Sequence, residues 1–105
     1  MKMVQAMVRP EKEAAVAAAL AKANFPAITK WDVVGRGKQK GIQVGTQVYD
    51  ELAKSMLLVV VEDDKLGTVM QIIKAVATTG YPGDGKVFVS PVESAVTIRT
   101  GKAEL

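Results

Sequence analysis

The segment Thr79–Val89 has the strongest chemical potential in this sequence. Glycines stand at positions 80, 83 and 85, and Lys86 follows the last of them. Glycines let successive backbone N–H groups converge on one anion, and a lysine adds a compact cation, so the pattern is typical of a phosphate or carboxylate site. The segment follows a predicted helix and precedes a predicted strand, which differs from the context and spacing of a Walker loop. A glycine-rich turn with a solvent-exposed lysine would contain the same residues.

Two further segments place basic residues among glycines. In Gly35–Gly41 glycines alternate with lysines, which makes a contact with phosphate or carboxylate physically easy. This segment opens the stretch 36–54, which fits neither the helical nor the strand period. A loop of this length inside a compact domain is usually functional or disordered, and the sequence leaves both alternatives open. The other segment, Arg99–Lys102, would by itself be a frayed basic tail.

The composition excludes several classes of chemistry. The chain has 105 residues, no cysteine and no histidine, which removes disulfide scaffolds, zinc fingers, thiol and serine–histidine hydrolases and histidine-based acid–base catalysis. The net charge of +3 is compatible with an anionic ligand and too small to argue for nucleic acid. A domain of this size has one core and no deep private cavity, so we expect a ligand site that is shallow or shared between subunits.

The hydropathy pattern predicts a soluble, cytoplasmic protein. The longest apolar run, Met56–Val61, is far shorter than the roughly 20 residues of a membrane helix. The N-terminus lacks the apolar stretch of a signal peptide. We therefore expect no direct insertion into a membrane.

Periodicity in the first half predicts strands over 3–8 and 28–34 on either side of an alanine-rich helix over 11–23. Asn24 and Pro26 are the expected stop of this helix. The two ends of the helix carry the charges that its dipole favours, acidic at the start and basic near the end.

The second half repeats this scheme. The apolar run 56–61 predicts a central strand, with Asp63 or Asp64 as the N-cap of the helix that follows. Residues at helical spacing make this the clearest amphipathic helix of the chain: Leu66, Val69, Met70, Ile73, Val76 and Ala77. Gly80 is expected to end it. Lys86–Val92 is the predicted fourth strand, with Ala95–Arg99 as its continuation or a short fifth.

A weak internal duplication relates the two halves. Arg9–Lys12 aligns with Glu62–Lys65, and Val16 aligns with Val69. Two strand–helix–strand units normally form a ferredoxin-like double βαβ sandwich, an α/β fold of the α+β type with a four-stranded antiparallel sheet and both helices on one face. Apolar residues on both faces of the central strand predict that other subunits cover the second face.

Together the three glycine and basic segments resemble the PII signal-transduction family. Thr79–Val89 matches the family's C-terminal signature, Gly35–Gly41 matches the root of its T-loop, and Ile98–Gly101 matches its C-terminal loop. The resemblance covers nearly the whole chain in the correct order. It implies a single domain over 1–105 with a T-loop over 36–54, a glycine-rich B-loop over 80–86 and a C-terminal loop over 99–105. It also implies a trimer with ligand clefts between subunits.

The resemblance implies a sensor and not an enzyme. Family members bind ATP or ADP in each cleft, and 2-oxoglutarate beside ATP through a magnesium ion. The phosphates would be held by Gly83, Asp84, Gly85 and Lys86, with Arg99 reaching them from the C-terminal side. The adenine would lie beside Thr29, in a pocket lined by Met7 and the backbone of Val60. The nucleotide would be bordered at the loop root by Gly35, Gly37 and Lys38.

The same resemblance assigns the remaining ligands. Gln39 would ligate magnesium and contact 2-oxoglutarate, and Lys54 would pair with the distal carboxylate of that acid. Lys40 would organise the T-loop when it is empty or bound to ADP. Glycine N–H groups, lysines and one divalent ion are chemically suited to gather a triphosphate and two carboxylates.

Several positions depart from the family pattern. The T-loop is shorter than usual and lacks the tyrosine segment that is uridylylated in enterobacterial members, so we do not expect modification of Tyr49. Leu58 stands where a glutamate usually lies near the adenine, and Thr97 replaces the first of two phosphate-binding arginines. A second type of subunit could supply the missing groups, so the assembly is expected to be a homotrimer or a hetero-oligomer with a second PII-like chain.

The short loop looks most like that of the nitrogenase-associated PII subgroup, in which two PII-like proteins are encoded beside nitrogenase genes. The resemblance implies inhibition of nitrogenase through its dinitrogenase component, relieved by 2-oxoglutarate and ATP. The alternative within the family is a regulator of an ammonium transporter or of a nitrogen-assimilation enzyme.

Two functions outside the family fit the sequence less well. An acylphosphatase on the same fold needs an arginine-bearing anion loop and an asparagine, and the only asparagine, Asn24, is beside no such loop. An RNA-recognition module needs stacking aromatic residues on the sheet. Trp31 and Phe88 are better explained as packing residues, so we expect no nucleic-acid partner.

Overall fold

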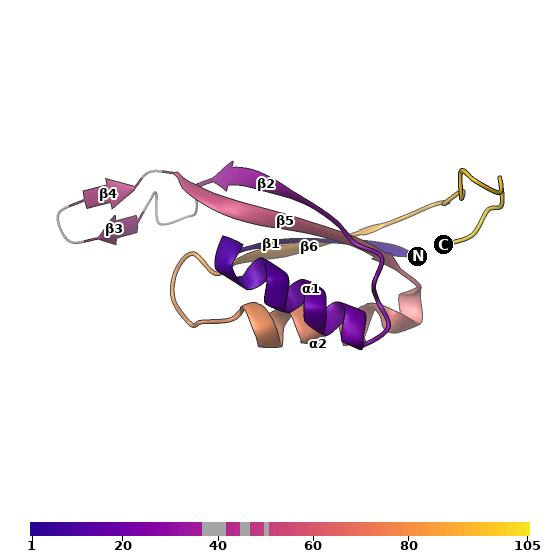
Figure 1. Ribbon diagram of the computed structural model, residues 1–105, viewed down its shortest axis with the longest axis horizontal. Coiled ribbons are helices and arrows are strands. Elements are labelled where there is room, and N and C mark those ends of the chain that lie inside the picture. The colour runs from indigo at the N-terminus through magenta and orange to yellow at the C-terminus, as the bar shows by residue number, and fades with distance from the viewer. Residues whose placement is uncertain (37–41, 45–46, 50) are drawn as a thin grey trace.

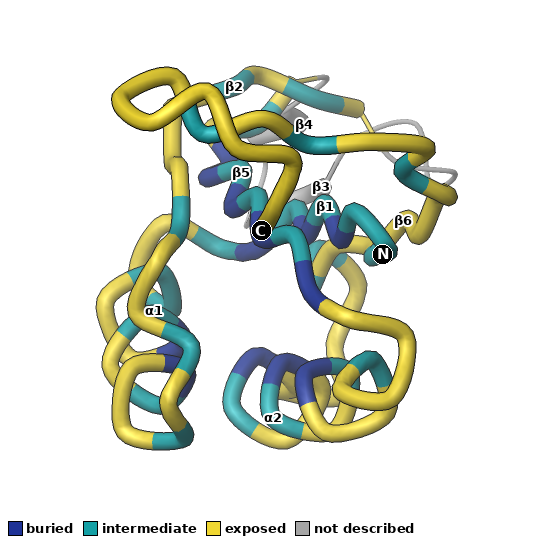
Figure 2. The backbone as a smooth tube through the Cα atoms, turned by 90° about the vertical axis from the view of Figure 1, so that its right-hand side faces the viewer, coloured by how far each residue is buried: buried dark blue, intermediate teal, exposed yellow. Residues whose placement is uncertain are grey.

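The computed structural model describes residues 1–36, 42–44, 47–49 and 51–105. Four strands form one antiparallel sheet in the order β2-β5-β1-β6, and two helices pack on one of its faces (Figures 1 and 2). This confirms the predicted ferredoxin-like α+β fold. The elements are β1 (Lys2–Val8), α1 (Glu13–Lys22), β2 (Thr29–Gly35), β5 (Leu52–Val61), α2 (Leu66–Ala77) and β6 (Gly85–Pro91).

The core lies between the helices and the two central strands. Alternate residues of β1 are fully buried on the helix-covered face: Val4, Ala6 and Val8. Their direct partners on β5 are Val59, Leu57 and Ser55. These partners lie on the same helix-covered face, because side chains of paired residues share one face of a sheet. Helix α2 packs its predicted apolar stripe on this layer, with Val69 and Ile73 almost completely buried.

The opposite side of the sheet, which we call the open face, is covered by no helix within the described residues (Figure 2). Strand register places the other set of alternating residues there. Most of them are apolar: Met3, Met7, Trp31, Met56, Leu58, Val60 and Phe88. Trp31 and Phe88 remain 41% and 50% exposed. An apolar sheet face of this kind is typical of an interaction surface.

The start of α2 differs from the sequence prediction. Neither Asp63 nor Asp64 caps the helix, because Asp63–Lys65 forms a short 3-10 turn (η2) ahead of it and no side chain caps either element. Asp63 instead pairs with the N-terminal amine at 3.0 Å and with the Lys2 ammonium at 3.3 Å. The carboxylate that was predicted to accept the helix N–H groups therefore forms ion pairs with two nearby cations. A matching 3-10 turn (η1, Pro10–Lys12) precedes α1, and Asn24 ends that helix with a left-handed φ of 77°.

The predicted strand over Ala95–Arg99 is wrong. After β6, the last backbone hydrogen bond between the C-terminal segment and the sheet end is donated by the Val92 N–H to the Met1 carbonyl, at 3.1 Å. Beyond it the chain has passed the end of β1 and has no strand to pair with (Figure 1). It closes a turn on itself, in which the Gly101 N–H donates to the Thr97 carbonyl at 2.7 Å. Ile98 is left 98% exposed.

The described part of the stretch 36–54 contains two short paired strands, β3 (Ile42–Val44) and β4 (Gln47–Tyr49). They form a sheet of their own, and β5 begins at Leu52. The hairpin and the C-terminal residues lie at opposite ends of a molecule that measures 55 × 22 × 20 Å (Figure 1). No helix among the described residues is long and apolar enough to cross a membrane.

Candidate anion-binding site

Lys54 lies at the end of the sheet nearest the β3–β4 hairpin and reaches the B-loop. Its ammonium Nζ donates to the carbonyl of Gly83, and the residue is only 9% exposed. Burial lowers the pKa of Lys54, and the positive charge of Arg9 lowers it further. Within the described residues Lys54 forms no salt bridge. A buried cation whose partner is a neutral carbonyl retains the capacity to bind an anion.

The carboxylate of Asp84 orders the loop that leads into β6. Its Oδ2 accepts the N–H groups of Thr79 and Gly80 at 2.8 and 2.9 Å, and its Oδ1 accepts the Thr79 hydroxyl. Arg9 Nε donates to the same Oδ1 at 3.0 Å. These bonds, above all those from Thr79, hold the pKa of Asp84 far below its usual range. The carboxylate is therefore engaged with the loop itself, and only the backbone N–H of Asp84 is suited to an anion.

Asp84 should make the folded protein sensitive to acid. Its folded pKa lies below the unfolded value of about 3.9, so its contribution to stability is present above that pH and is lost as the pH falls toward the folded pKa. The free energy of unfolding, measured with urea between pH 6 and pH 2.5, should fall less steeply for Asp84→Asn than for the wild type. Asp64→Asn, which removes an exposed carboxylate outside this network, should keep the wild-type slope. Equal slopes for the wild type and Asp84→Asn would contradict the assignment.

Two neighbouring cations set the direction of the peptide groups in the B-loop. Arg9 donates to the carbonyl of Pro82 at 3.0 Å, and Lys54 donates to the carbonyl of Gly83. A trans peptide is planar, with its C=O and N–H antiparallel. The N–H groups of Gly83 and Asp84 therefore point away from these two cations. Neither donates a hydrogen bond within the described part of the chain, so both are available to an anion.

Gly85 has a structural requirement that is independent of any ligand. Its φ is +107°, and a Cβ atom at this position would lie 1.7 Å from the Met7 carbonyl oxygen. The B-loop thus returns to the sheet directly against the backbone of β1. Packing therefore accounts for the glycine at 85, whereas Gly83, also with a positive φ of 103°, is the glycine whose N–H is left available.

The predicted site residues separate into two groups. Gly35, Lys54 and the B-loop residues Gly83–Lys86 lie at the hairpin end of the sheet, since Gly35 pairs with Leu52 and Lys86 with Met7. Thr29 and Val60 lie farther along the sheet, paired with Leu58 and Met3 respectively. Arg99 belongs to the segment that follows β6, and this segment lies beyond the other end of the sheet (Figure 1). At about 3.3 Å per residue, the six residues from Lys54 to Val60 span roughly 20 Å.

The remaining predicted residues lie outside the part of the chain that the structure describes: Gly37, Lys38, Gln39 and Lys40. This set includes Gln39, the predicted magnesium ligand. The described residues hold no group of three acidic side chains suited to a metal ion.

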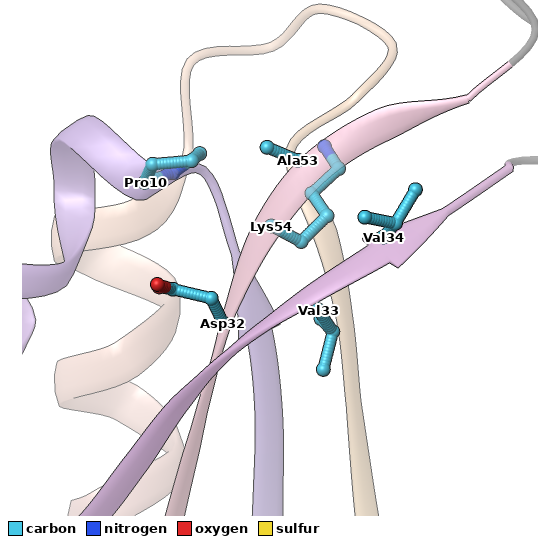
Figure 3. A pocket seen from close by; sticks show the side chains of 6 residues that line it. All are labelled: Pro10, Asp32, Val33, Val34, Ala53 and Lys54. Atoms are coloured by element: carbon cyan, nitrogen blue, oxygen red, sulfur yellow. The ribbon is translucent and has the colours of Figure 1, made fainter.

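Arg9 is a residue of this region that sequence reasoning missed. It bonds to residues 73 and 75 positions away, and its only sequence signal is a basic residue at the end of a strand. A shallow pocket of about 410 Å³ lies nearby and is lined by Pro10, Asp32, Val33, Val34, Ala53 and Lys54. Asp32 points away from the Lys54 ammonium there (Figure 3), so the two charges do not converge on one ligand.

Comparison with known proteins identifies the family. The family model described as "Nitrogen regulatory protein P-II" matches residues 1–102. The chain belongs to the PII family. It is 55% identical over 100 residues to "Nitrogen fixation nifHD region glnB-like protein 1" of Methanococcus maripaludis, covering 95% of each chain. It is 54% identical over 100 residues, with the same coverage, to the protein of that name from Methanothermobacter marburgensis.

A third relative matches along its full length. The "Nitrogen fixation nifHD2 region GlnB-like protein 1" of Methanosarcina barkeri is 50% identical over 105 residues, covering all of both chains. These relatives confirm the resemblance to the nitrogenase-associated PII subgroup. PII proteins are regulatory signal transducers and not enzymes, as the resemblance implied.

Proposed function

We propose that this chain is a cytoplasmic PII sensor that binds ATP or ADP and, with MgATP, 2-oxoglutarate, and that controls a target of nitrogen fixation through its T-loop. The observation that carries the proposal is the meeting of Lys54 with the B-loop at one end of the sheet. There a buried ammonium lies on one side of the loop peptides and two available N–H groups point to the other side, so each can bind a different negatively charged group of the ligands.

The ligand roles follow from this arrangement. Phosphates would accept the N–H groups at Gly83–Gly85 and pair with Lys86, whereas Lys54 would bind the distal carboxylate of 2-oxoglutarate. The loop root, with Gly35, Gly37 and Lys38, would border the nucleotide. Gln39 would ligate Mg²⁺ beside the acid, and Lys40 would organise the loop in the empty or ADP-bound state. The adenine would lie against Thr29 and Val60, with Arg99 completing the phosphate site.

The distribution of these residues supports a site shared between subunits. The segment that contains Arg99 lies beyond one end of the sheet and the B-loop lies at the other, so we propose that a second chain brings the two groups together around one nucleotide. The open face offers the surface for such an assembly, because most of its residues are apolar and each of the four strands contributes at least one of them. We propose a trimer, either of identical chains or with a second PII-like subunit.

Titration calorimetry tests the ligand assignment. 2-Oxoglutarate should bind the wild-type protein when MgATP is present and should give no heat of binding with either the nucleotide or the metal left out, since the ion links the acid to the phosphates. Binding of equal affinity without nucleotide would contradict the proposed cleft.

The names of the three relatives described above direct the choice of target. Their names place them in nifHD regions, so we propose that this chain inhibits nitrogenase by binding the dinitrogenase component, and that 2-oxoglutarate with ATP relieves the inhibition. Affinity capture from nitrogen-fixing cells should recover dinitrogenase subunits, and added MgATP with 2-oxoglutarate should release them. Recovery of an ammonium transporter or a nitrogen-assimilation enzyme without nitrogenase would favour the alternative target.

A further inference from the structure

The segment 78–84, which joins α2 to β6 and contains most of the B-loop, has little apolar packing to hold its shape. Residues 78–82 are all exposed, and the loop joins the end of α2 to an edge strand of the sheet. Its order must therefore come from polar contacts, because exposed loops of small and polar residues are otherwise free to move. Asp84 ties the loop to itself, through Thr79 and Gly80. Contacts from other elements come from Arg9, after β1, and Lys54, in β5.

Arg9 makes two different contacts with one planar group. Nε donates to Asp84 Oδ1 at 3.0 Å, and a terminal nitrogen donates to the Pro82 carbonyl at 3.0 Å. The guanidinium fork thus fixes the distance between residues 82 and 84, on either side of Gly83. By holding the Pro82 carbonyl it also aims the Gly83 N–H away from itself.

We propose that Arg9 is a positioning residue of the anion site: through Asp84 and the Pro82 carbonyl it holds the B-loop so that the Gly83 N–H faces the phosphates. This inference rests on the proposed nucleotide binding. Arg9 is only 22% exposed and two of its nitrogens are engaged with the loop, so the loop is the element that a change at Arg9 disturbs first.

The variant Arg9→Lys tests this role, because it retains the charge and replaces the two-nitrogen fork with a single nitrogen. ATP affinity measured by calorimetry should fall about tenfold, in keeping with the loss of one charge-assisted hydrogen bond. Lys12→Gln is the matched control, since it removes a positive charge three residues away that makes no ion pair within the described residues. It should bind ATP as the wild type does.

A double-mutant cycle separates positioning from direct contact. If Arg9 acts through Asp84, the double variant Arg9→Lys with Asp84→Asn should lose less affinity than the product of the two single losses. Independent losses that multiply would mean that Arg9 does not act through Asp84 and would overturn the proposal. Melting temperatures of all variants, measured without ligand, identify any general loss of folding.

Hydrogen exchange supplies a readout that needs no ligand. The Thr79 and Gly80 amides, which bond to Asp84, should exchange faster in Arg9→Lys while amides of the central strands keep their rates. Wild-type ATP affinity in Arg9→Lys would overturn the role of Arg9 and leave the proposed function intact. Failure of the wild type itself to bind ATP would overturn both, and faster exchange would then mark Arg9 as a residue of loop stability alone.

Discussion

Replacing Lys54 with alanine is expected to lower the affinity for 2-oxoglutarate, in the presence of MgATP, by roughly a hundredfold, as measured by calorimetry. The buried ammonium has no carboxylate partner within the described residues and is bonded to the Gly83 carbonyl. An incoming carboxylate would therefore gain a charge-assisted bond at a site that is already largely desolvated. Without Lys54 the carboxylate would lose this bond and still be largely desolvated.

Companion variants make this result specific. Lys54→Met retains the apolar stem of the side chain and should lose affinity as Lys54→Ala does, because the charge and not the packing binds the acid. Lys86→Ala should weaken ATP more than 2-oxoglutarate, since Lys86 is assigned to the phosphates. If Lys54→Ala bound 2-oxoglutarate with wild-type affinity, the distal carboxylate would have another partner.

Lys54 should also make the binding of 2-oxoglutarate depend on pH in the alkaline range. Burial first, and then the charge of Arg9, lower the pKa of Lys54, and only the protonated form pairs with a carboxylate. Binding of 2-oxoglutarate should therefore weaken at a lower pH than it would with an ordinary lysine, whose pKa is about 10.4. The bound acid opposes this shift, because its negative charge stabilises the ammonium.

Local patterns were sufficient to predict most of the fold. The apolar stripe of α2 indicates one buried face, and the structure buries Val69 and Ile73 as expected, in one core with Val4. The prediction failed where residues far apart in the sequence compete for a partner. Asp63 has the residue type of an N-cap. Its carboxylate instead pairs with the N-terminal amine and with Lys2, which belong to the start of the chain.

The residue types of the candidate site were predictable from the sequence, but the contacts between its residues were not. Glycines and lysines in a short segment indicate anion chemistry wherever they occur. The contact of Lys54 with Gly83 spans 29 residues and that of Arg9 with Asp84 spans 75, so both depend on strand order and register. Likewise, the sequence does not separate Gly85, which packing requires, from Gly83, whose N–H is available. Only the distance to the β1 backbone distinguishes them.

Gly85→Ala should be the most destabilising single substitution of these experiments. Its Cβ would overlap the Met7 carbonyl oxygen at 1.7 Å and approach the carbonyl carbon at 2.8 Å, so β1 and β6 would have to separate. The residue would also be strained at a φ of +107°. We expect a loss of about 4 kcal/mol or more in the free energy of unfolding, which is a large part of the 5–15 kcal/mol typical of a domain.

Gly80→Ala is the matched control for Gly85→Ala. Its φ of +89° imposes the same kind of backbone strain, but a Cβ there would meet nothing within 4 Å. Gly80→Ala should lower the free energy of unfolding by about 1 kcal/mol.

Gly67→Ala, at an open position inside α2, should instead stabilise the protein by about 1 kcal/mol. Urea denaturation at one protein concentration compares all three, since assembly would make stability depend on concentration. If Gly85→Ala were no less stable than Gly80→Ala, close packing of the B-loop against β1 would be wrong, and the glycine at 85 would need a role in ligand binding to explain it.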